Sequence, residues 1–335
     1  MNKHLVTGSS GFVGSAIVKK LVSQGFKVIS IDIIEDKEIS KISEYHKIDI
    51  SEENHSLDNI LSEVEAIHHN AALVPLTKAG KNFYKSNFLG TKKILDLAIK
   101  NKVKHFSHMS SSAIFGKPKK AGFNVDYANY NPTGIYGVSK YQAELEVLEK
   151  KNNFKSCSVI RPRPIVGGGR LGIFEILFDW VKDHKKIPVI GSGKNKFQFA
   201  HIDDLVDVSI ETADRNLSGI FNIGTDKFDT LQNDLNSAFK IIGSRSKVFP
   251  INKEFCISAL FLLDKLSLSP LTSWHYLSYS WDFYYDQNKN FDRLNWRPKY
   301  SNIEMIVEAY NWYIKNLNEI NNENSIHRSK IKQKF

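Results

Sequence analysis

Tyr136 and Lys140 are the pair of side chains in this sequence whose types and spacing best suit acid–base chemistry. They stand four residues apart, so both lie on one face if the segment is helical. An ordinary tyrosine phenol titrates at about pH 10, and a neighbouring ammonium favours the phenolate. A phenolate beside a substrate alcohol can take its proton while a hydride leaves the carbon. The pair therefore predicts hydride-transfer chemistry at a secondary alcohol or ketone.

A serine cluster supplies the hydroxyl that such a site needs. Ser110, Ser111 and Ser112 follow the predicted strand 105–110. A serine there can hydrogen-bond the substrate oxygen and hold it. The Tyr-x-x-x-Lys pattern recurs at Tyr285 and Lys289, so the spacing alone is weak evidence. Only the pair at 136 and 140 begins a predicted helix in the sheet domain and follows a serine cluster, so we assign the site there.

A glycine turn near the start of the chain predicts a dinucleotide site. Residues 7–14 read TGSSGFVG, after a predicted strand and at the start of a predicted helix. Such glycines let the backbone approach a pyrophosphate, which the N–H groups and positive dipole of the helix N-terminus attract. Asp32 ends the next predicted strand, where a carboxylate accepts hydrogen bonds from ribose hydroxyls and repels a 2′-phosphate. The pattern therefore favours NAD over NADP.

Composition excludes several other classes of protein. The chain has 335 residues and only two cysteines, which rules out a disulfide framework and favours a reducing, cytoplasmic location. The longest apolar run, 255–263, is too short to span a bilayer, so we expect no stable membrane insertion. The net charge is +10, but the lysines are scattered and part of the excess lies at 327–334. We therefore expect no nucleic-acid partner, and we expect no bound metal.

Strands alternate with helices along the first two thirds of the chain. This alternation predicts an α/β fold, a Rossmann-type doubly wound parallel sheet. The predicted strands are 4–7, 28–32, 66–70, 105–110, 156–161 and 219–222, and the predicted helices are 11–24, 82–100, 136–150, 174–184 and 203–214.

The second half of the sequence is more mixed and predicts a smaller, interleaved C-terminal cap. We assign 1–165 to the NAD-binding domain, with 200–224 returning to it. Residues 166–199 and 225–317 form the substrate-binding cap, and 318–335 form a polar basic tail.

These residues together resemble the extended short-chain dehydrogenase/reductase superfamily, in its NAD-dependent epimerase/dehydratase group. The resemblance covers nearly the whole chain and rests on motifs beyond the glycine turn and the Tyr–Lys pair. These further motifs are Asp49-Ile50, residues 69–72 (HNAA), 87–91 (NFLGT), 110–116 (SSSAIFG), 201–204 (HIDD) and 296–298 (WRP).

The resemblance implies a role for each matching residue. Ser111, Tyr136 and Lys140 correspond to the catalytic residues, and the family's chemistry usually passes through a keto form of the substrate. The implied NAD-binding residues are Gly8, Ser10, Gly11, Phe12, Val13, Gly14, Asp32, Asp49, Ile50, Ala71, Ala72, Leu73, Asn87, Tyr136, Lys140 and Pro162. The implied substrate-binding residues are Val74, Ser112, Arg163 and Arg170. By analogy, the helices predicted at 82–100 and 136–150 are candidates for a homodimer interface.

Departures from the family pattern affect the substrate more than the fold. Sugar-nucleotide dehydratases carry Thr-Asp-Glu where this chain has Ser111-Ser112-Ala113, so we expect no dehydration. Many sugar-nucleotide epimerases have an asparagine where this chain has Pro164, and an arginine where it has Phe197. A diphosphate would therefore need other cations, such as Arg163, Arg170, Lys194 or Lys196, although a solvated surface charge is the expectation for each.

Three functions stay open at this point. The first is a nucleotide-sugar 4-epimerase or ketoreductase. The second is an enzyme that oxidises a sterol or lipid alcohol, because residues 161–167 (RPRPIVG) and 275–298 resemble the 3β-hydroxysteroid dehydrogenase branch. The aromatic residues at 274–285 could line an apolar pocket, although packing in the cap core is the expected role. The third is a non-catalytic NAD sensor, which would have no need of a tuned phenol.

Overall fold

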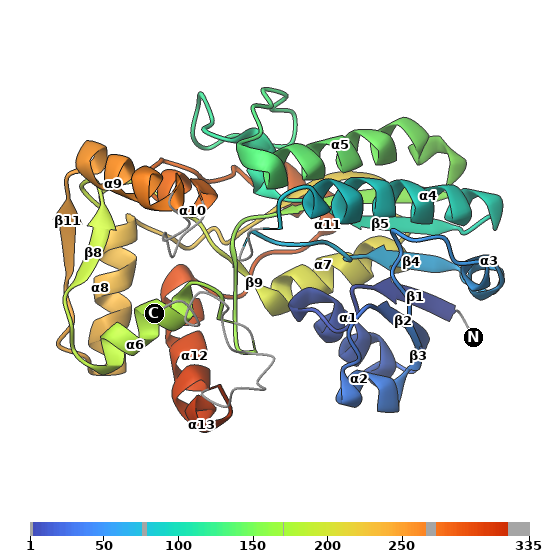
Figure 1. Ribbon diagram of the computed structural model, residues 1–335, viewed down its shortest axis with the longest axis horizontal. Coiled ribbons are helices and arrows are strands. Elements are labelled where there is room, and N and C mark those ends of the chain that lie inside the picture. Colours follow the sequence, from blue (N-terminus) through green and yellow to red (C-terminus); the bar gives the residue numbers. More distant parts are fainter. Residues whose placement is uncertain (1–2, 76–78, 170, 266–272, 321–335) are drawn as a thin grey trace.

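A central sheet of seven parallel strands organises the computed structural model, which describes residues 3–75, 79–169, 171–265 and 273–320. The strand order is β10-β6-β5-β4-β1-β2-β3 (Figure 1), and every pairing in it is parallel. The strands are β1 (Lys3–Thr7), β2 (Lys27–Asp32), β3 (Glu44–Lys47), β4 (Ala66–His69), β5 (His105–Met109), β6 (Ser156–Pro162) and β10 (Gly219–Ile223). The order reverses between β1 and β4, which is where such sheets bind ligands. The predicted doubly wound fold is confirmed.

Helices cover both faces of this sheet (Figure 1). On one face, α1 (Phe12–Ser23) and α7 (Ile202–Asp214) bury Ile17, Val206 and Ile210 against the strands. On the other face, α4 (Gly90–Lys100) and α5 (Gly134–Lys150) bury Ile94, Leu95 and Val147. The shorter α2 (Lys37–Ile42) and α3 (Ser56–Leu61) complete the two layers. Burial of both faces explains why most strands are rich in apolar residues.

Five buried histidines lie in three neighbouring strands of the sheet. His4, His68, His69, His105 and His108 lie in β1, β4 and β5, and all are buried. His4 Nδ1 lies 3.1 Å from His68 Nε2, and His68 Nδ1 lies 3.0 Å from Ser209 Oγ. His105 Nδ1 lies 2.7 Å from Ser156 Oγ. These four histidines, His4, His68, His69 and His105, therefore pair with one another or with hydroxyls inside the sheet, whereas both ring nitrogens of His108 are buried without a partner within the described residues.

The cap is a second layered unit beside the sheet (Figure 1). It contains a parallel two-stranded sheet of β8 (Ile187–Ile190) and β11 (Val248–Ile251). Helices α6 (Phe174–Lys182), α8 (Leu231–Ile242) and α12 (Asn302–Lys315) enclose its core, in which Phe178, Phe239 and Tyr313 are buried. The remaining helices are α9 (Lys253–Lys265), α10 (Ser273–Ser278), α11 (Asn288–Leu294) and α13 (Leu317–Ile320).

The cap contacts the sheet domain through a short strand pair and through a cluster of aromatic side chains. A short parallel pair, β7 (Ile165–Val166) and β9 (Ala200–His201), marks where the chain leaves the sheet and where it returns to it. An aromatic cluster packs Phe115, from the turn after β5, against Phe123, Phe283 and Tyr285. The aromatic residues near 283 are therefore core, as expected. Our residue-by-residue division into domain and cap stays a proposal.

Several local predictions need correction. The strands β3, β8 and β11 were not predicted, because these short strands carry polar residues or a proline. The helix predicted at 82–100 is two pieces, a π-helical turn (Tyr84–Leu89) followed by α4. Within the predicted tail 318–335, α13 continues to Ile320, whose side chain lies in the cap core, and residues 321–335 lie outside the described residues. None of the helices within the described ranges is long and apolar enough to cross a membrane.

Candidate active site

The glycine turn between β1 and α1 has the shape that a pyrophosphate requires. Gly8 has a φ of +68°, and a Cβ there would lie 2.7 Å from the backbone nitrogen of Ala71. A Cβ on Gly14 would lie 2.1 Å from the Gly8 carbonyl oxygen. Gly11 caps α1 without a side-chain hydrogen bond, and the first turn of α1 holds no acidic residue. The helix N-terminus therefore keeps N–H donors and positive dipole for an anion.

Asp32, at the end of β2, hydrogen-bonds this turn through its carboxylate. Its Oδ2 accepts a hydrogen bond from the Ser10 backbone N–H at 3.0 Å, and its Oδ1 accepts one from the Ile34 N–H at 3.1 Å. Ser10 Oγ in turn donates to the Ile34 carbonyl at 2.6 Å. The carboxylate therefore lies beside the glycine turn, where the ribose-binding role predicted for it requires it to be.

Asn87 ties the end of β4 to the helix that carries Tyr136. Its Oδ1 accepts from the Leu73 N–H at 2.7 Å, and its Nδ2 donates to the Leu73 carbonyl at 3.1 Å. Nδ2 also donates to Ser139 Oγ at 3.1 Å, and Ser139 donates to the Tyr136 carbonyl at 2.9 Å. Asn87 lies on the π-helical turn, an irregularity frequent at functional sites. One amide thus aligns the segment predicted to line the cofactor with the helix that carries Tyr136.

The other residues predicted to contact the cofactor lie around the same edge of the sheet. The Ala71 N–H donates to Thr7 Oγ1 at 3.2 Å, which brings the end of β4 against the end of β1. Ile50 is buried and would contact a Cβ on Gly90, while Asp49 is exposed and accepts from the Ser51 N–H at 2.8 Å. The remaining members are partly or fully buried, and they are Phe12, Val13, Ala72 and Pro162.

Tyr136 and Lys140 lie on the first turns of α5, and Ser111 comes from the turn after β5. The Ser111 hydroxyl hydrogen-bonds Tyr136 and accepts from the Ala113 N–H at 3.1 Å. Burial raises the pKa of the Tyr136 phenol, and the hydrogen bond with Ser111 opposes that shift. Lys140 Nζ donates to the Met109 carbonyl at 2.6 Å. The structure therefore brings the three predicted catalytic residues together.

The state of these groups differs from the sequence prediction in one respect. We expected Lys140 to hold the phenol partly acidified. In the structure, burial lowers the pKa of Lys140 to about 8, and the neighbouring Glu144 opposes that shift. The lysine donates to a main-chain oxygen of β5. Without further positive charge beside it, Tyr136 is therefore a protonated phenol at neutral pH.

A buried ion pair beneath Lys140 escaped the sequence analysis. Glu144 accepts from Arg161 Nε at 3.1 Å on each carboxylate oxygen, from Arg161 Nη2 and from the Ser110 hydroxyl. Arg161 Nη2 also donates to Tyr130 Oη at 3.0 Å. The available signal was the position of Glu144, four residues after Lys140 on the same helix face. The pair fixes α5 to the ends of β5 and β6.

The residues predicted to contact the substrate differ in how far the structure buries them. Ser112 is buried and accepts from Arg163 Nη1 at 3.3 Å. Arg163 is itself buried, so the expectation of a solvated surface charge is wrong for it. That expectation holds for Lys194 and Lys196, which are exposed. Val74 is partly buried, and Arg170 lies outside the described residues.

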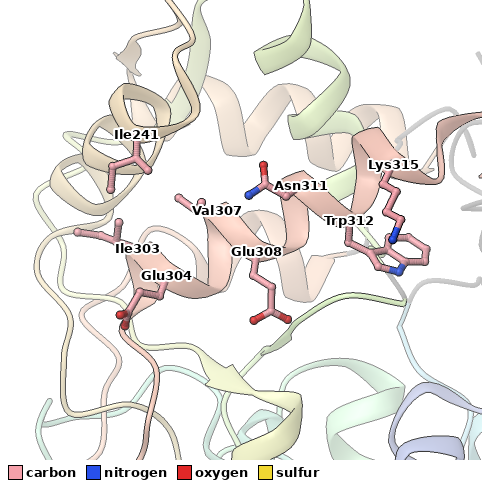
Figure 2. Close-up of a pocket in the computed structure, with 8 residues that line it drawn as sticks. All are labelled: Ile241, Ile303, Glu304, Val307, Glu308, Asn311, Trp312 and Lys315. Carbon is pink, nitrogen blue, oxygen red and sulfur yellow. The ribbon is translucent and has the colours of Figure 1, made fainter.

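The second Tyr–Lys match does not form a comparable site. Tyr285 precedes α11, is buried among aromatic side chains, and lies in the cluster with Phe115 and Phe283. Lys289 forms an exposed ion pair with Asp126. A pocket of about 530 Å³ lies elsewhere in the cap. Figure 2 shows its lining, which comes from α8 and α12 and includes Ile241, Val307 and Trp312 but none of the predicted site residues.

A family model and several known proteins match this chain over most of its length. The model of the NAD dependent epimerase/dehydratase family matches residues 4–224. An ADP-L-glycero-D-manno-heptose-6-epimerase of Brachyspira hyodysenteriae is 30% identical over 271 residues, which are 73% of this chain and 84% of that protein. A Sinorhizobium fredii protein named uncharacterized protein y4nG is 35% identical over 335 residues, which are 99% of this chain and 84% of that protein.

Solved structures share the fold. A UDP-glucose 4-epimerase of Thermotoga maritima with UDP-glucose superposes with a TM-score of 0.75 at 24% identity, covering 94% of this chain and 99% of that one. A UDP-glucuronic acid 4-epimerase of Bacillus cereus with UDP-glucuronic acid and NAD gives 0.75 at 22% identity, covering 94% and 99%.

Proposed function

Because the chain belongs to the NAD-dependent epimerase/dehydratase family, we propose that it transfers a hydride at a secondary alcohol or ketone of a nucleotide-sugar, with Tyr136 as general acid and base. The observation that carries this proposal is the junction of Ser111, Tyr136 and Lys140, tied through Asn87 to the segment beside the glycine turn. A 4-epimerase and a ketoreductase are the two forms of this activity that we propose.

The residues present fit NAD. A Cβ at Gly8 or Gly14 would clash with the backbone of Ala71 or of Gly8, so the turn can pack this closely only with glycine, and the uncapped start of α1 follows it. In this proposal the turn residues 8–14 hold the pyrophosphate and Asp32 binds the adenosine ribose. Ala71 to Leu73 line the cofactor, and Lys140 binds near the nicotinamide. When bound, NAD supplies a hydride acceptor and a positive charge at its nicotinamide ring.

The side chains of the protein transfer the proton of the substrate hydroxyl and hold the substrate oxygen in place. In the oxidative direction, Ser111 donates a hydrogen bond to the substrate oxygen, and Tyr136 takes the hydroxyl proton as the hydride leaves the same carbon. Because burial raises the pKa of Tyr136, the phenolate needs the positive charges of Lys140 and the cofactor close to it. In the reverse direction, Tyr136 returns the proton to the ketone oxygen.

The substrate assignment rests on the relatives and on the turn after β5. The Brachyspira relative is named for a sugar-nucleotide epimerase. Residues 111–113 supply no carboxylate, and Glu144 is engaged by Arg161 and Ser110. An acid–base pair for eliminating water is therefore missing from this turn, and we propose epimerisation or ketoreduction over dehydration.

One experiment separates the open functions. The purified protein is analysed for tightly bound NAD and then incubated with UDP- and ADP-linked sugars, with and without added NAD, while product and NADH are followed. An epimerase converts the sugar without net NADH, and a ketoreductase changes NADH in proportion to product. Turnover of a 3β-hydroxysterol with no turnover of any nucleotide-sugar would replace the proposal with the sterol alternative. NAD binding without any turnover would indicate a sensor.

A further inference from the structure

Two buried arginines stand two residues apart at the end of β6, and only one of them has a carboxylate partner. Arg161 is 0% exposed and pairs with Glu144. Arg163 is 1% exposed, and no carboxylate within the described residues acts on it. A buried charge with no counter-charge is costly, so proteins usually pair it or use it. Arg163 therefore calls for an explanation that Arg161 does not.

The surroundings of Arg163 hold its side chain in one orientation. Nε donates to the Gln198 carbonyl at 3.2 Å, and Nη1 donates to Ser112 Oγ at 3.3 Å. The guanidinium lies 3.7 Å from the Phe283 ring centroid and 4.6 Å from that of Phe197. Such stacking is favourable for arginine and leaves the edge of the planar fork for hydrogen bonds.

One donor at this position, Arg163 Nη2, has no hydrogen-bond partner within the described residues. The hydroxyl of Tyr285 interacts with Ser112, and the Tyr285 ring centroid lies 6.0 Å from the guanidinium carbon. Burial lowers the pKa of Arg163 to about 10, so the group is still cationic at neutral pH. The neighbouring polar side chains are hydroxyls, which can also donate. The cluster thus offers donors and a positive charge, which together suit an oxyanion.

The position of this cluster indicates which part of a substrate would meet it. Ser112 directly follows Ser111, whose hydroxyl contacts Tyr136. Ser112, which accepts from Arg163, is therefore the neighbour of the residue that contacts Tyr136, and the guanidinium packs on Phe197 and Phe283 of the cap. Building on the proposed function, we infer that Arg163, with Ser112 and Tyr285, binds a carboxylate carried by the sugar ring, so that the substrate is a nucleotide-linked uronic acid or another acidic sugar.

UDP-glucuronate and UDP-glucose make a matched test, because they differ only at C6, which carries a carboxylate in the first and a hydroxymethyl group in the second. The proposal predicts that the wild-type enzyme, loaded with NAD, has a KM for UDP-glucuronate lower than that for UDP-glucose by about 30-fold or more. Calorimetry with UDP alone measures what the nucleotide contributes. This comparison needs no variant, so it holds even if substitution of Arg163 impairs folding.

Variants then assign the preference to one side chain. Arg163→Gln should raise KM for UDP-glucuronate about 30-fold or more, while KM for UDP-glucose and binding of UDP stay nearly unchanged. Arg163→Lys keeps the charge but not the fork, and should restore part of the preference. Lys240→Gln, which removes an exposed cation on the cap helix α8, is the matched control and should leave both substrates unaffected.

The outcomes separate this inference from the proposed function. Equal KM values for the two sugars in the wild type, with normal Tyr136-dependent turnover, would overturn the carboxylate site and leave the proposed function standing. An equal loss for UDP, UDP-glucose and UDP-glucuronate in Arg163→Gln would show that the arginine binds the diphosphate instead. Failure of every nucleotide-sugar to bind or react would overturn the proposed function itself.

Discussion

At the scale of single residues, the site combines a partly buried phenol with charged groups that are held by other partners. Tyr136 touches Ser111, while Lys140 is held on the Met109 carbonyl and Glu144 is neutralised by Arg161. Burial disfavours the phenolate until positive charge is added beside it. In the proposed mechanism, proton removal is therefore favoured only when the positive charge of the bound cofactor lies beside Tyr136.

Asp32 carries the prediction about cofactor choice. Replacing it in Asp32→Ala removes the carboxylate beside the glycine turn. We expect NAD affinity to fall about 10- to 100-fold, because hydrogen bonds to a charged group contribute about 1.5–3 kcal/mol, and we expect NADP to be rejected less strongly.

Titration of both cofactors by calorimetry measures the change. Asp36→Ala is the control, because Asp36 caps α2 nearby and contacts only backbone N–H groups there. An unchanged preference for NAD in Asp32→Ala would remove the assigned role.

At the scale of elements, the predicted site residues could be read from the sequence, but the structural elements that position them could not. The glycine turn, Asp32 and the Tyr136–Lys140 pair were predicted because local spacing encodes them, whereas the family resemblance selected Ser111 within its serine cluster. The π-helical turn that carries Asn87 and the Glu144–Arg161 pair were not predicted. They depend on which elements meet in three dimensions, and Arg161 is 17 residues away from its partner. The edge strand β3 was missed because its residues, EYHK, lack an apolar pattern.

Packing of the glycine turn gives the prediction at this scale. A Cβ on Gly14 would lie 2.1 Å from the Gly8 carbonyl oxygen, so Gly14→Ala must push α1 away from the turn. We expect NAD binding to be lost and the melting temperature to fall, since overpacking typically costs about 1–3 kcal/mol.

Gly25→Ala is the matched control for this change. Gly25 has a φ of +86°, but nothing lies within 4 Å of a Cβ there. We expect a stability loss of about 1–2 kcal/mol from backbone strain, with NAD binding retained. Equal NAD binding by the two variants, measured by calorimetry, would contradict the role of the turn.

At the scale of the whole molecule, the sheet and the cap meet through aromatic side chains and the two short strands β7 and β9. The cluster of Phe115, Phe123, Phe283 and Tyr285 joins the catalytic turn to the cap, which explains why aromatic residues gather near 283. The sequence predicted a cap and a sheet domain from the change in pattern. It could not predict Arg163 as a buried residue, because burial there is created by cap residues far along the chain, such as Phe197 and Phe283.

The histidines of the sheet make global stability depend on pH. Burial lowers the pKa of His4 to about 4 and those of His69 and His105 to about 3, from an ordinary value of 6.5. Between those values and pH 6.5 the unfolded chain binds more protons than the folded one. The stability that these groups contribute is therefore complete above pH 6.5 and is lost progressively as pH falls toward 3 to 4.

Urea unfolding at several pH values tests this prediction. We expect the free energy of unfolding to fall steadily from pH 7 to pH 5, and His105→Gln to show a shallower fall than the wild type. His55→Gln, which changes an exposed histidine, should keep the wild-type slope. A free energy of unfolding that does not change over this range would show that the buried imidazoles do not control acid stability.

The most direct test of the central claim is Tyr136→Phe, because this change removes one oxygen and leaves the ring that packs against Phe83. Turnover of the nucleotide-sugar and NAD affinity are measured on the same preparation. We expect turnover to fall about 100-fold or more, because a general acid–base group is removed, while NAD affinity stays near the wild-type value. Near-normal turnover in this variant would contradict the assignment of Tyr136 as the proton-transferring group.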